Sequence, residues 1–243
     1  MELWQSIPFA CILLPLGSAA VTAILKERRA KYWTMFVLCC LTAMSALFLV
    51  KMSGYAGSYT YMMGHFPAPW GNELRVGVLE AGMALFFSII MLLSILGGRK
   101  KLDGEVEHTK HNIYYILCDL LMTSLLALVY TNDLFTAYVF VEINTIAACG
   151  LIMIRQNGRC IEAAVRYMIM SLLGSGLLLM GICMLYDLTG HLLMENIQQQ
   201  ITAIMAAGTY RIPMLITIGI ITVGLSIKSA LFPFHSWVPD AYG

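Results

Sequence analysis

Charged residues are scarce in this sequence. Asp, Glu, Lys and Arg make up 12% of its 243 residues, about half of their share in an average soluble domain. Hydrophobic residues make up 59%, and the net charge is only +1. So few charges exclude an ordinary soluble surface, and the absence of basic runs argues against nucleic acid as a partner. The composition predicts a polytopic helical membrane protein in contact with a lipid bilayer.

The seven cysteines lack the spacing of a metal or redox site. None belongs to a CxxC pair, no histidine stands at ligand spacing from them, and all lie in or at the ends of hydrophobic segments. This pattern argues against iron–sulfur, haem and zinc sites. We therefore expect no metal, no cofactor and no redox centre in this chain.

Seven hydrophobic stretches are long enough to cross a bilayer, whose core needs about 20 helical residues. They lie near residues 6–25, 32–50, 77–97, 112–130, 134–154, 161–186 and 212–232. The first stretch follows Met1 without a basic n-region or a small-residue cleavage site, so we expect a retained span rather than a signal peptide. The predicted fold class is an all-α, polytopic membrane helical bundle of about seven helices.

The basic residues are distributed unevenly between the loops. Ten of the fifteen Lys and Arg residues fall in the loops after the first, third and fifth stretches, whereas the opposite loops hold only Lys51, Arg75 and Arg211. By the positive-inside rule, the basic loops face the cytoplasm and the N-terminus lies outside. We expect a multi-pass protein of the cell's inner (plasma) membrane.

Two of the predicted outer loops are long. Residues 51–76 are rich in Gly, Tyr and Pro and favour an irregular interfacial segment. Residues 187–211 carry apolar positions at helical spacing and predict a short amphipathic helix on the membrane surface.

Glu142 and Lys228 are isolated charges inside apolar stretches. A lone charge in hydrocarbon is costly, so such groups normally face protein or water and mark functional sites. Glu142 belongs to a stripe with Tyr138, Thr145 and Cys149 that should face protein, about 13 Å from the outer end of its helix. We predict that Glu142 and Lys228 form an intramembrane ion pair; the alternative for Glu142 is a protonated carboxyl group that is hydrogen-bonded between helices.

The last predicted helix should be broken directly after Lys228. Pro233 cannot donate a hydrogen bond to the carbonyl of Ser229, and its ring crowds that turn, so we expect an interruption between Ser229 and His235. The flanking aromatic residues Phe232, Phe234 and Trp237 could wedge the opened turn. His235 could relay a proton near neutral pH, or it could stabilise the break through a hydrogen bond.

Two further charges lie inside the predicted spans. Asp119 is about 10 Å, and Arg166 about 7 Å, from the cytoplasmic ends of their helices, and their similar depth predicts an ion pair. Lys228 is the fallback partner of Asp119, and Arg166 could instead extend to the cytoplasmic surface. For the small residues near Arg166 we favour a packing role; these are Ser171, Gly174, Ser175 and Gly176.

The sequence resembles the antiporter-like membrane subunits shared by respiratory complex I, Mrp-type sodium/proton antiporters and membrane-bound group 4 hydrogenases. The matching segments are NDLFTAYVFVEINTIAACGLI, EAAVRYMIMSLLGSGLLLMGICMLYDLTG and KSALFPFHSWVPDAYG, with a weaker likeness in HFPAPWGNELRVGVLEAGMALF. The resemblance implies that Glu142 is the family's fifth-helix glutamate and Lys228 its seventh-helix lysine, the pair that gates proton movement. His235 and Pro233 match the histidine and proline of the family's broken helix.

The resemblance also implies the N-terminal part of an inverted-repeat transporter fold. Residues 1–111 would be a three-helix region with an interfacial loop, and residues 112–243 an incomplete first repeat of helices 4 to 7. Relatives are about twice as long, so we expect either a fragment of a longer product or a second chain that supplies the rest. The sequence departs from the family at Glu80, where an aspartate is usual, at Arg166, where a lysine is common, and at Asp119, where an apolar residue is expected.

By resemblance, the chain is a proton- or sodium-translocating subunit of a redox-driven or Mrp-type complex, a translocase subunit that leaves electron transfer to its partners. Those partners would be other antiporter-like and small membrane subunits and a peripheral redox arm. One alternative is a scaffold subunit that moves no ions. A second is a retinal-binding seven-helix protein, which needs a lysine in a continuous helix and tryptophans around the chromophore, whereas the four tryptophans here lie near helix ends or in loops.

Overall fold

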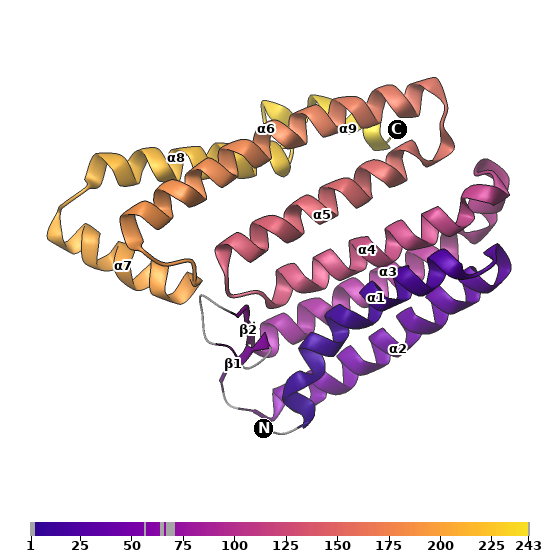
Figure 1. The fold of residues 1–243 in the computed structure, drawn as a ribbon, viewed down its shortest axis with the longest axis horizontal. Coiled ribbons are helices and arrows are strands. Elements are labelled where there is room, and N and C mark those ends of the chain that lie inside the picture. The colour runs from indigo at the N-terminus through magenta and orange to yellow at the C-terminus, as the bar shows by residue number, and fades with distance from the viewer. Residues whose placement is uncertain (1–2, 56, 64–65, 67–70, 243) are drawn as a thin grey trace.

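The computed structural model describes residues 3–55, 57–63, 66 and 71–242, which form a bundle of long helices with a small hairpin at one end (Figure 1). In chain order, the elements are η1 (Leu3–Ser6), α1 (Ile7–Ile24), α2 (Glu27–Ser53), β1 (Tyr59–Met62), β2 (Glu73–Val76), α3 (Val78–Glu105), η3 (His108–Lys110), α4 (His111–Tyr130), α5 (Leu134–Ile152), η4 (Met153–Arg155), α6 (Gly158–Thr189), α7 (Met194–Ala207), α8 (Arg211–Lys228), η5 (Phe234–Trp237) and α9 (Val238–Tyr242).

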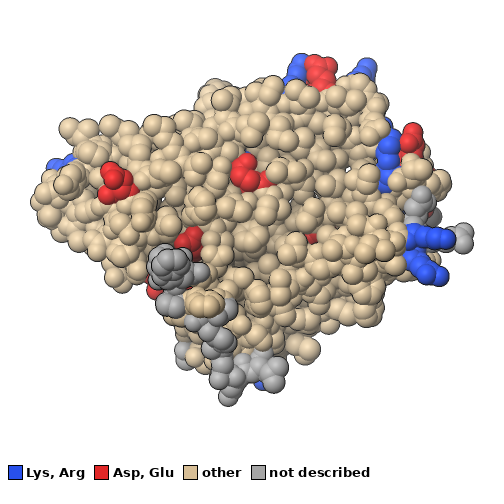
Figure 2. All heavy atoms as spheres, viewed as in Figure 1, with Lys and Arg blue, Asp and Glu red and all other residues tan. Residues whose placement is uncertain are grey.

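Within the described residues, seven helices are long and apolar enough to cross a membrane, namely α1 to α6 and α8. They coincide with the seven predicted stretches and confirm the predicted fold class. Large apolar side chains such as Leu47, Val50 and Leu93 stay exposed on their outer faces, as expected where lipid takes the place of water. On the face drawn in Figure 2, most of the surface is uncharged, and Lys and Arg side chains gather near the edges.

The first four long helices pack around a common apolar core. α1 lies against both α2 and α4, and α2 lies against α3. Phe48, Leu41, Tyr115 and Tyr130 are almost completely buried there. Because lipid tails are as apolar as these side chains, close van der Waals packing stabilises such a core in a membrane.

The segment between α2 and α3 contains a hairpin, so the prediction of an irregular segment is wrong for β1 and β2. The two strands pair antiparallel, with Tyr59 opposite Val76, which satisfies their backbone hydrogen-bonding groups. The Asn132 side chain donates to the Glu73 carboxylate at 3.0 Å, and the backbone N–H of Asn132 donates to the Glu73 carbonyl at 3.0 Å. These bonds hold the hairpin against the connection between α4 and α5. Positions 56, 64–65 and 67–70 of the predicted segment lie outside the described residues.

The predicted amphipathic helix is present as α7, whereas its position on the membrane surface stays a prediction. Ile197 is buried on its inner face, whereas Gln198 and Gln199 are exposed. Arg75 of the hairpin forms an ion pair with Glu195 in the first turn of α7, with an N–O distance of 2.9 Å. α7 therefore lies at the hairpin end of the bundle (Figure 1).

α6 and α8 approach each other closely because glycine faces glycine between them. A Cβ atom on Gly224 would come within 2.9 Å of the Gly174 carbonyl oxygen, closer than real Cβ contacts. The predicted packing role of Gly174 is thus confirmed. α5 lies between α4 and α6. The last residue of α8, Lys228, contacts both α5 and α6.

Candidate functional site

The candidate site lies where α5, α6 and α8 meet. α5 begins at Leu134 because the Asp133 carboxylate accepts the backbone N–H of Thr136 at 2.6 Å and caps the helix. This start sets the height of Glu142, two turns further along. Along the predicted polar stripe, Thr145 and Cys149 are buried and Glu142 is partly buried, so the stripe faces protein as expected.

Lys228 is the last residue of α8, and its ammonium group points into the space between α5 and α6. Its Nζ donates to Glu142 Oε1 at 3.0 Å, to Thr145 Oγ1 at 2.8 Å and to Ser171 Oγ at 2.8 Å. A lysine ammonium has three protons to donate. The three acceptors therefore satisfy it completely, and the predicted contact between Glu142 and Lys228 is confirmed.

Glu142 has a second partner besides Lys228. Ser175 Oγ forms a short hydrogen bond with Glu142 Oε1 and also a 2.8 Å bond with the Ser171 carbonyl. The side chains of Lys228 and Glu142 are only 12% and 22% exposed. Charge-assisted bonds in such a protected place are stronger than bonds between neutral groups in water.

The hydroxyl groups of Ser171 and Ser175 are functional candidates that the sequence interpretation missed, because it gave both residues a packing role only. Both are buried on α6 and are one helical turn apart. Ser171 Oγ also donates to Thr145 Oγ1 at 3.3 Å, which ties the two hydroxyl groups that hold the ammonium. The i, i+4 spacing of two serines on an otherwise apolar helix is the signal that could have identified them.

The predicted break is present directly after Lys228. α8 ends there, Ala230 adopts a left-handed backbone conformation with φ of 53°, and a short 3-10 helix starts at Phe234. The predicted wedging by aromatic residues is wrong for Phe232, which is 86% exposed. Trp237, which is also predicted to pack at the break, is buried, with its ring 4.9 Å from that of Tyr167 on α6. The alternative of a retinal-binding protein requires a continuous seventh helix, and the break after Lys228 contradicts it.

His235 and Pro233 are both exposed in the segment that follows α8. The His235 ring stacks on Phe232, with ring centroids 5.8 Å apart. Among the described residues, the His235 side chain forms no hydrogen bond, and the hydrogen bonds of Lys228 go to other residues. The relay role of His235 stays a prediction.

The predicted ion pair between Asp119 and Arg166 is wrong, and so is the fallback pair of Asp119 with Lys228. Asp119 faces α1 and α2, where it accepts hydrogen bonds from Ser18 and Thr34. Arg166 lies on α6, on the far side of α5. Similar depth in the membrane does not bring two side chains together when their helices turn them toward different neighbours.

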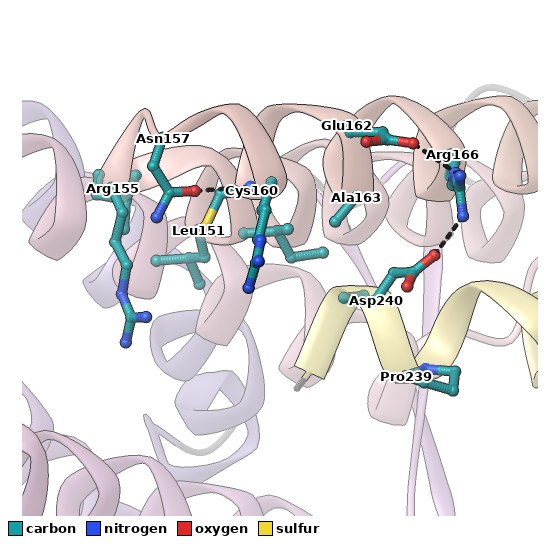
Figure 3. Close-up of a pocket in the computed structure, with 13 residues that line it drawn as sticks. Leu151, Arg155, Asn157, Cys160, Glu162, Ala163, Arg166, Pro239 and Asp240 are labelled. Atoms are coloured by element: carbon teal, nitrogen blue, oxygen red, sulfur yellow. Dashed lines mark hydrogen bonds and ion pairs between the residues drawn. The ribbon is translucent and has the colours of Figure 1, made fainter.

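Arg166 pairs with two acids near the end of the bundle where α5 joins α6. Its distances are 2.7 Å to Glu162 one turn earlier on α6 and 2.6 Å to Asp240 on α9. Figure 3 shows the guanidinium group of Arg166 between these two carboxylates. Arg166 lines a cavity of about 770 Å³, which Arg155 and Asn157 also line. The side chain of Arg166 is 57% exposed, in agreement with the alternative that it extends to the surface.

All seven cysteines are free thiols. Among the residues that the structure describes, no group of three or more His, Cys, Asp or Glu side chains is placed to hold a metal ion. The chemistry that the candidate site itself offers is the exchange of a proton or cation on a carboxylate–ammonium pair.

Comparison with known proteins supports a membrane transport class for this fold. The family model described as "NADH:quinone oxidoreductase/Mrp antiporter, TM" matches residues 131–243. The NADH-quinone oxidoreductase subunit N of Desulforudis audaxviator is 30% identical over 239 residues, which cover 97% of this chain and 46% of that protein. One of the subunits of a probable K(+)/H(+) antiporter of Rhizobium meliloti is 28% identical over 95% of this chain and 43% of its own length.

Solved structures agree with these sequence matches. A chain of the membrane-bound sulfane sulfur reductase, an archaeal respiratory membrane complex, is 26% identical with a TM-score of 0.87, over 98% of this chain and 47% of that one. A chain of the Mrp complex from Dietzia sp. shares the fold, with 20% identity and a TM-score of 0.81 over 100% of this chain and 44% of that one.

The fold and the matches define a membrane antiporter-like subunit. The chain belongs to the family of such subunits that complex I and Mrp antiporters share. It spans about half the length of the curated relatives that it matches.

Proposed function

We propose that the chain translocates protons or sodium ions through a half channel that the Glu142–Lys228 pair gates. The observation that carries the proposal is the direct ion pair at 3.0 Å between two helices that cross the membrane. An intramembrane ion pair is costly to maintain and is typically retained for function. The family membership supports ion movement as that function.

The proposed gate alternates between two states of the pair. When Glu142 is charged, it holds the Lys228 ammonium together with Thr145 and Ser171. A proton that arrives at Glu142 removes the counter-charge of Lys228, so the ammonium is then held by neutral hydroxyl groups only. Loss of that counter-charge favours release of a proton from Lys228. The break after Lys228 supplies backbone carbonyls that can bind water beside it.

The proposal extends to the setting of the chain. Other antiporter-like and small membrane subunits would be its partners, with a peripheral redox arm if the complex is redox-driven. The basic loops would face the cytoplasm and the N-terminus the outside of the plasma membrane. The division into a leading region at 1–111 and an incomplete repeat at 112–243 is part of the same proposal.

Transport by the complete complex in lipid vesicles tests the proposal. A pH-sensitive dye inside the vesicles reports proton movement with and without sodium, which separates the two ions. We expect Glu142→Gln and Lys228→Met each to slow transport at least about tenfold, since each removes an ion pair worth more than about 1.4 kcal/mol. Glu195→Gln is the matched control, because Glu195 lies in a surface ion pair on α7.

Unchanged transport in both pair variants, in fully assembled complexes, would contradict the proposed gate. The chain would then have the role of a scaffold subunit. Immunoblotting of the purified complex establishes assembly, so a loss of transport that only reflects a missing subunit is recognised as such.

A further inference from the structure

A second buried acid lies away from the Glu142–Lys228 pair. Asp119, in the middle of α4, has no exposed surface and faces the helices α1 and α2. Ser18 and Thr22 of α1 and Thr34 of α2 surround it and are each at most 2% exposed. The three helices contact one another directly. The proposed ion path does not use this cluster.

The oxygen atoms of the cluster converge but are not fully bonded. Ser18 Oγ donates to Asp119 Oδ2 at 2.7 Å, and Thr34 Oγ1 donates to the same oxygen at 3.5 Å. Thr22 lies beside the carboxylate, one turn after Ser18. Thr22 Oγ1 and Asp119 Oδ1 are both buried, and neither has a well-formed hydrogen bond among the described residues beyond their approach to each other. Such pairs of unsatisfied buried oxygens require an explanation, and a bound ion is one.

The cluster also lacks a positive charge. No Lys, Arg or His side chain that the structure describes lies within 4.0 Å of the Asp119 carboxylate. If Asp119 is ionised, its carboxylate carries a charge that the surrounding hydroxyl groups do not compensate. One positive charge neutralises it, whereas a divalent ion would leave an excess of one. The ligand that the charge balance selects is therefore monovalent.

We propose that Asp119, Ser18, Thr22 and Thr34 bind a sodium ion between α1, α2 and α4. All of the donors are carboxylate or hydroxyl oxygens, which are the ligands of hard cations. A proton on Asp119 Oδ1 could be donated to Thr22 Oγ1 and would satisfy these two oxygens, whereas a sodium ion would engage the hydroxyl oxygens of Ser18 and Thr34 as well. The ion would tie α1 and α2 of the leading region to α4 and would be independent of transport at the Glu142–Lys228 pair.

Thermal unfolding of the full chain in mild detergent, at mildly alkaline pH, tests this site. The midpoint Tm is measured in NaCl, KCl and choline chloride at one ionic strength. We expect Tm to rise saturably with sodium and to rise less with potassium, because a ligand that binds only the folded state stabilises it. Asp119→Asn removes the sodium-dependent rise, because its amide needs no counter-charge.

Two more variants separate this site from others. Thr22→Val keeps the side-chain shape but removes one ligand, and we expect it to raise the half-saturating sodium concentration about tenfold. Glu142→Gln retains the wild-type sodium response, because it lies outside the cluster. A sodium response that disappears in Glu142→Gln instead would move the ion to the central pair and overturn the proposal.

Infrared spectroscopy distinguishes the ion from a proton. If Asp119 is simply protonated, the wild-type chain shows a carboxylic acid C=O band that is unchanged by sodium and is lost in Asp119→Asn. That result, or equal Tm values in all three salts, refutes the site. Where Asp119→Asn does not fold, the Thr22→Val titration and the wild-type infrared spectrum still decide between the two states.

Discussion

The ion pair between Lys228 and Glu142 predicts a coupling energy that a double-mutant cycle can measure. The cycle compares the wild type with Lys228→Met, Glu142→Gln and the double variant. Each single change removes one charge of the pair and keeps a side chain of similar size. The coupling energy is the part of the two effects that does not add.

The geometry bounds the size of this coupling. At the observed N–O distance of 3.0 Å, the attraction of two unit charges is about 5 kcal/mol with an effective dielectric constant of about 20. We expect the measured coupling to be smaller, because each single variant can relax: Glu142 can take up a proton, and Lys228 keeps the hydroxyl groups of Thr145 and Ser171. We expect a coupling of about 2–4 kcal/mol.

The assay is reversible unfolding in mixed detergent micelles, with tryptophan fluorescence and far-UV circular dichroism as two probes of the same transition. Agreement of the probes in all four proteins establishes that their free energies of unfolding can be compared. A coupling below about 0.5 kcal/mol, the limit of additivity for independent sites, would refute the inference that the pair is held in a protected, low-dielectric place.

Two further predictions concern the surroundings of the pair. The double variant Thr145→Val with Ser171→Ala leaves the Lys228 ammonium with one acceptor, and we expect transport in vesicles to fall about tenfold or more at normal assembly. The control is Thr222→Val, which removes an exposed hydroxyl group of α8 and should transport normally. Gly224→Ala should destabilise the chain by about 1–3 kcal/mol in detergent unfolding, because its Cβ would meet the backbone of α6 at 2.9 Å. The matched change Gly219→Ala meets nothing within 4 Å and should be neutral or stabilising, so equal losses in both variants would exclude the helix contact as the cause.

The spans, the break and the central pair could be predicted because each has a strong local signal. Seven apolar stretches define the crossing helices, and Pro233 lacks the donor that a continuous helix needs. Glu142 and Lys228 are the isolated acid and base of their spans, so the high energy of an unpaired charge in lipid leaves them few other partners.

The partners of Asp119 and of the Lys228 ammonium could not be predicted in the same way. Spacing along a helix gives the depth of a residue, but the rotation of that helix against its neighbours depends on contacts between distant segments. Asp119 and Arg166 have similar depth, yet α4 turns its acid toward Ser18 while α6 turns its base toward Asp240. Hydroxyl groups such as Ser171 carry even less information, because serine serves both close packing and hydrogen bonding in membrane helices.

The two members of the central pair are stabilised unequally, and this determines which of them is the more sensitive to loss of the other. The Lys228 ammonium has two hydroxyl acceptors besides Glu142, and it lies at the C-terminal end of α8, where the helix dipole favours a positive charge. Glu142 lies within α5, away from any helix N-terminus, and has only Ser175 besides the lysine among the described residues. Removing Glu142 therefore leaves an ammonium group that releases its proton more readily but keeps two hydroxyl acceptors, whereas removing Lys228 leaves a carboxylate with Ser175 alone among the described residues. The same cycle tests this difference: Lys228→Met should cost more stability than Glu142→Gln, and the reverse order would mean that the hydroxyl groups and the helix dipole contribute little to holding the ammonium.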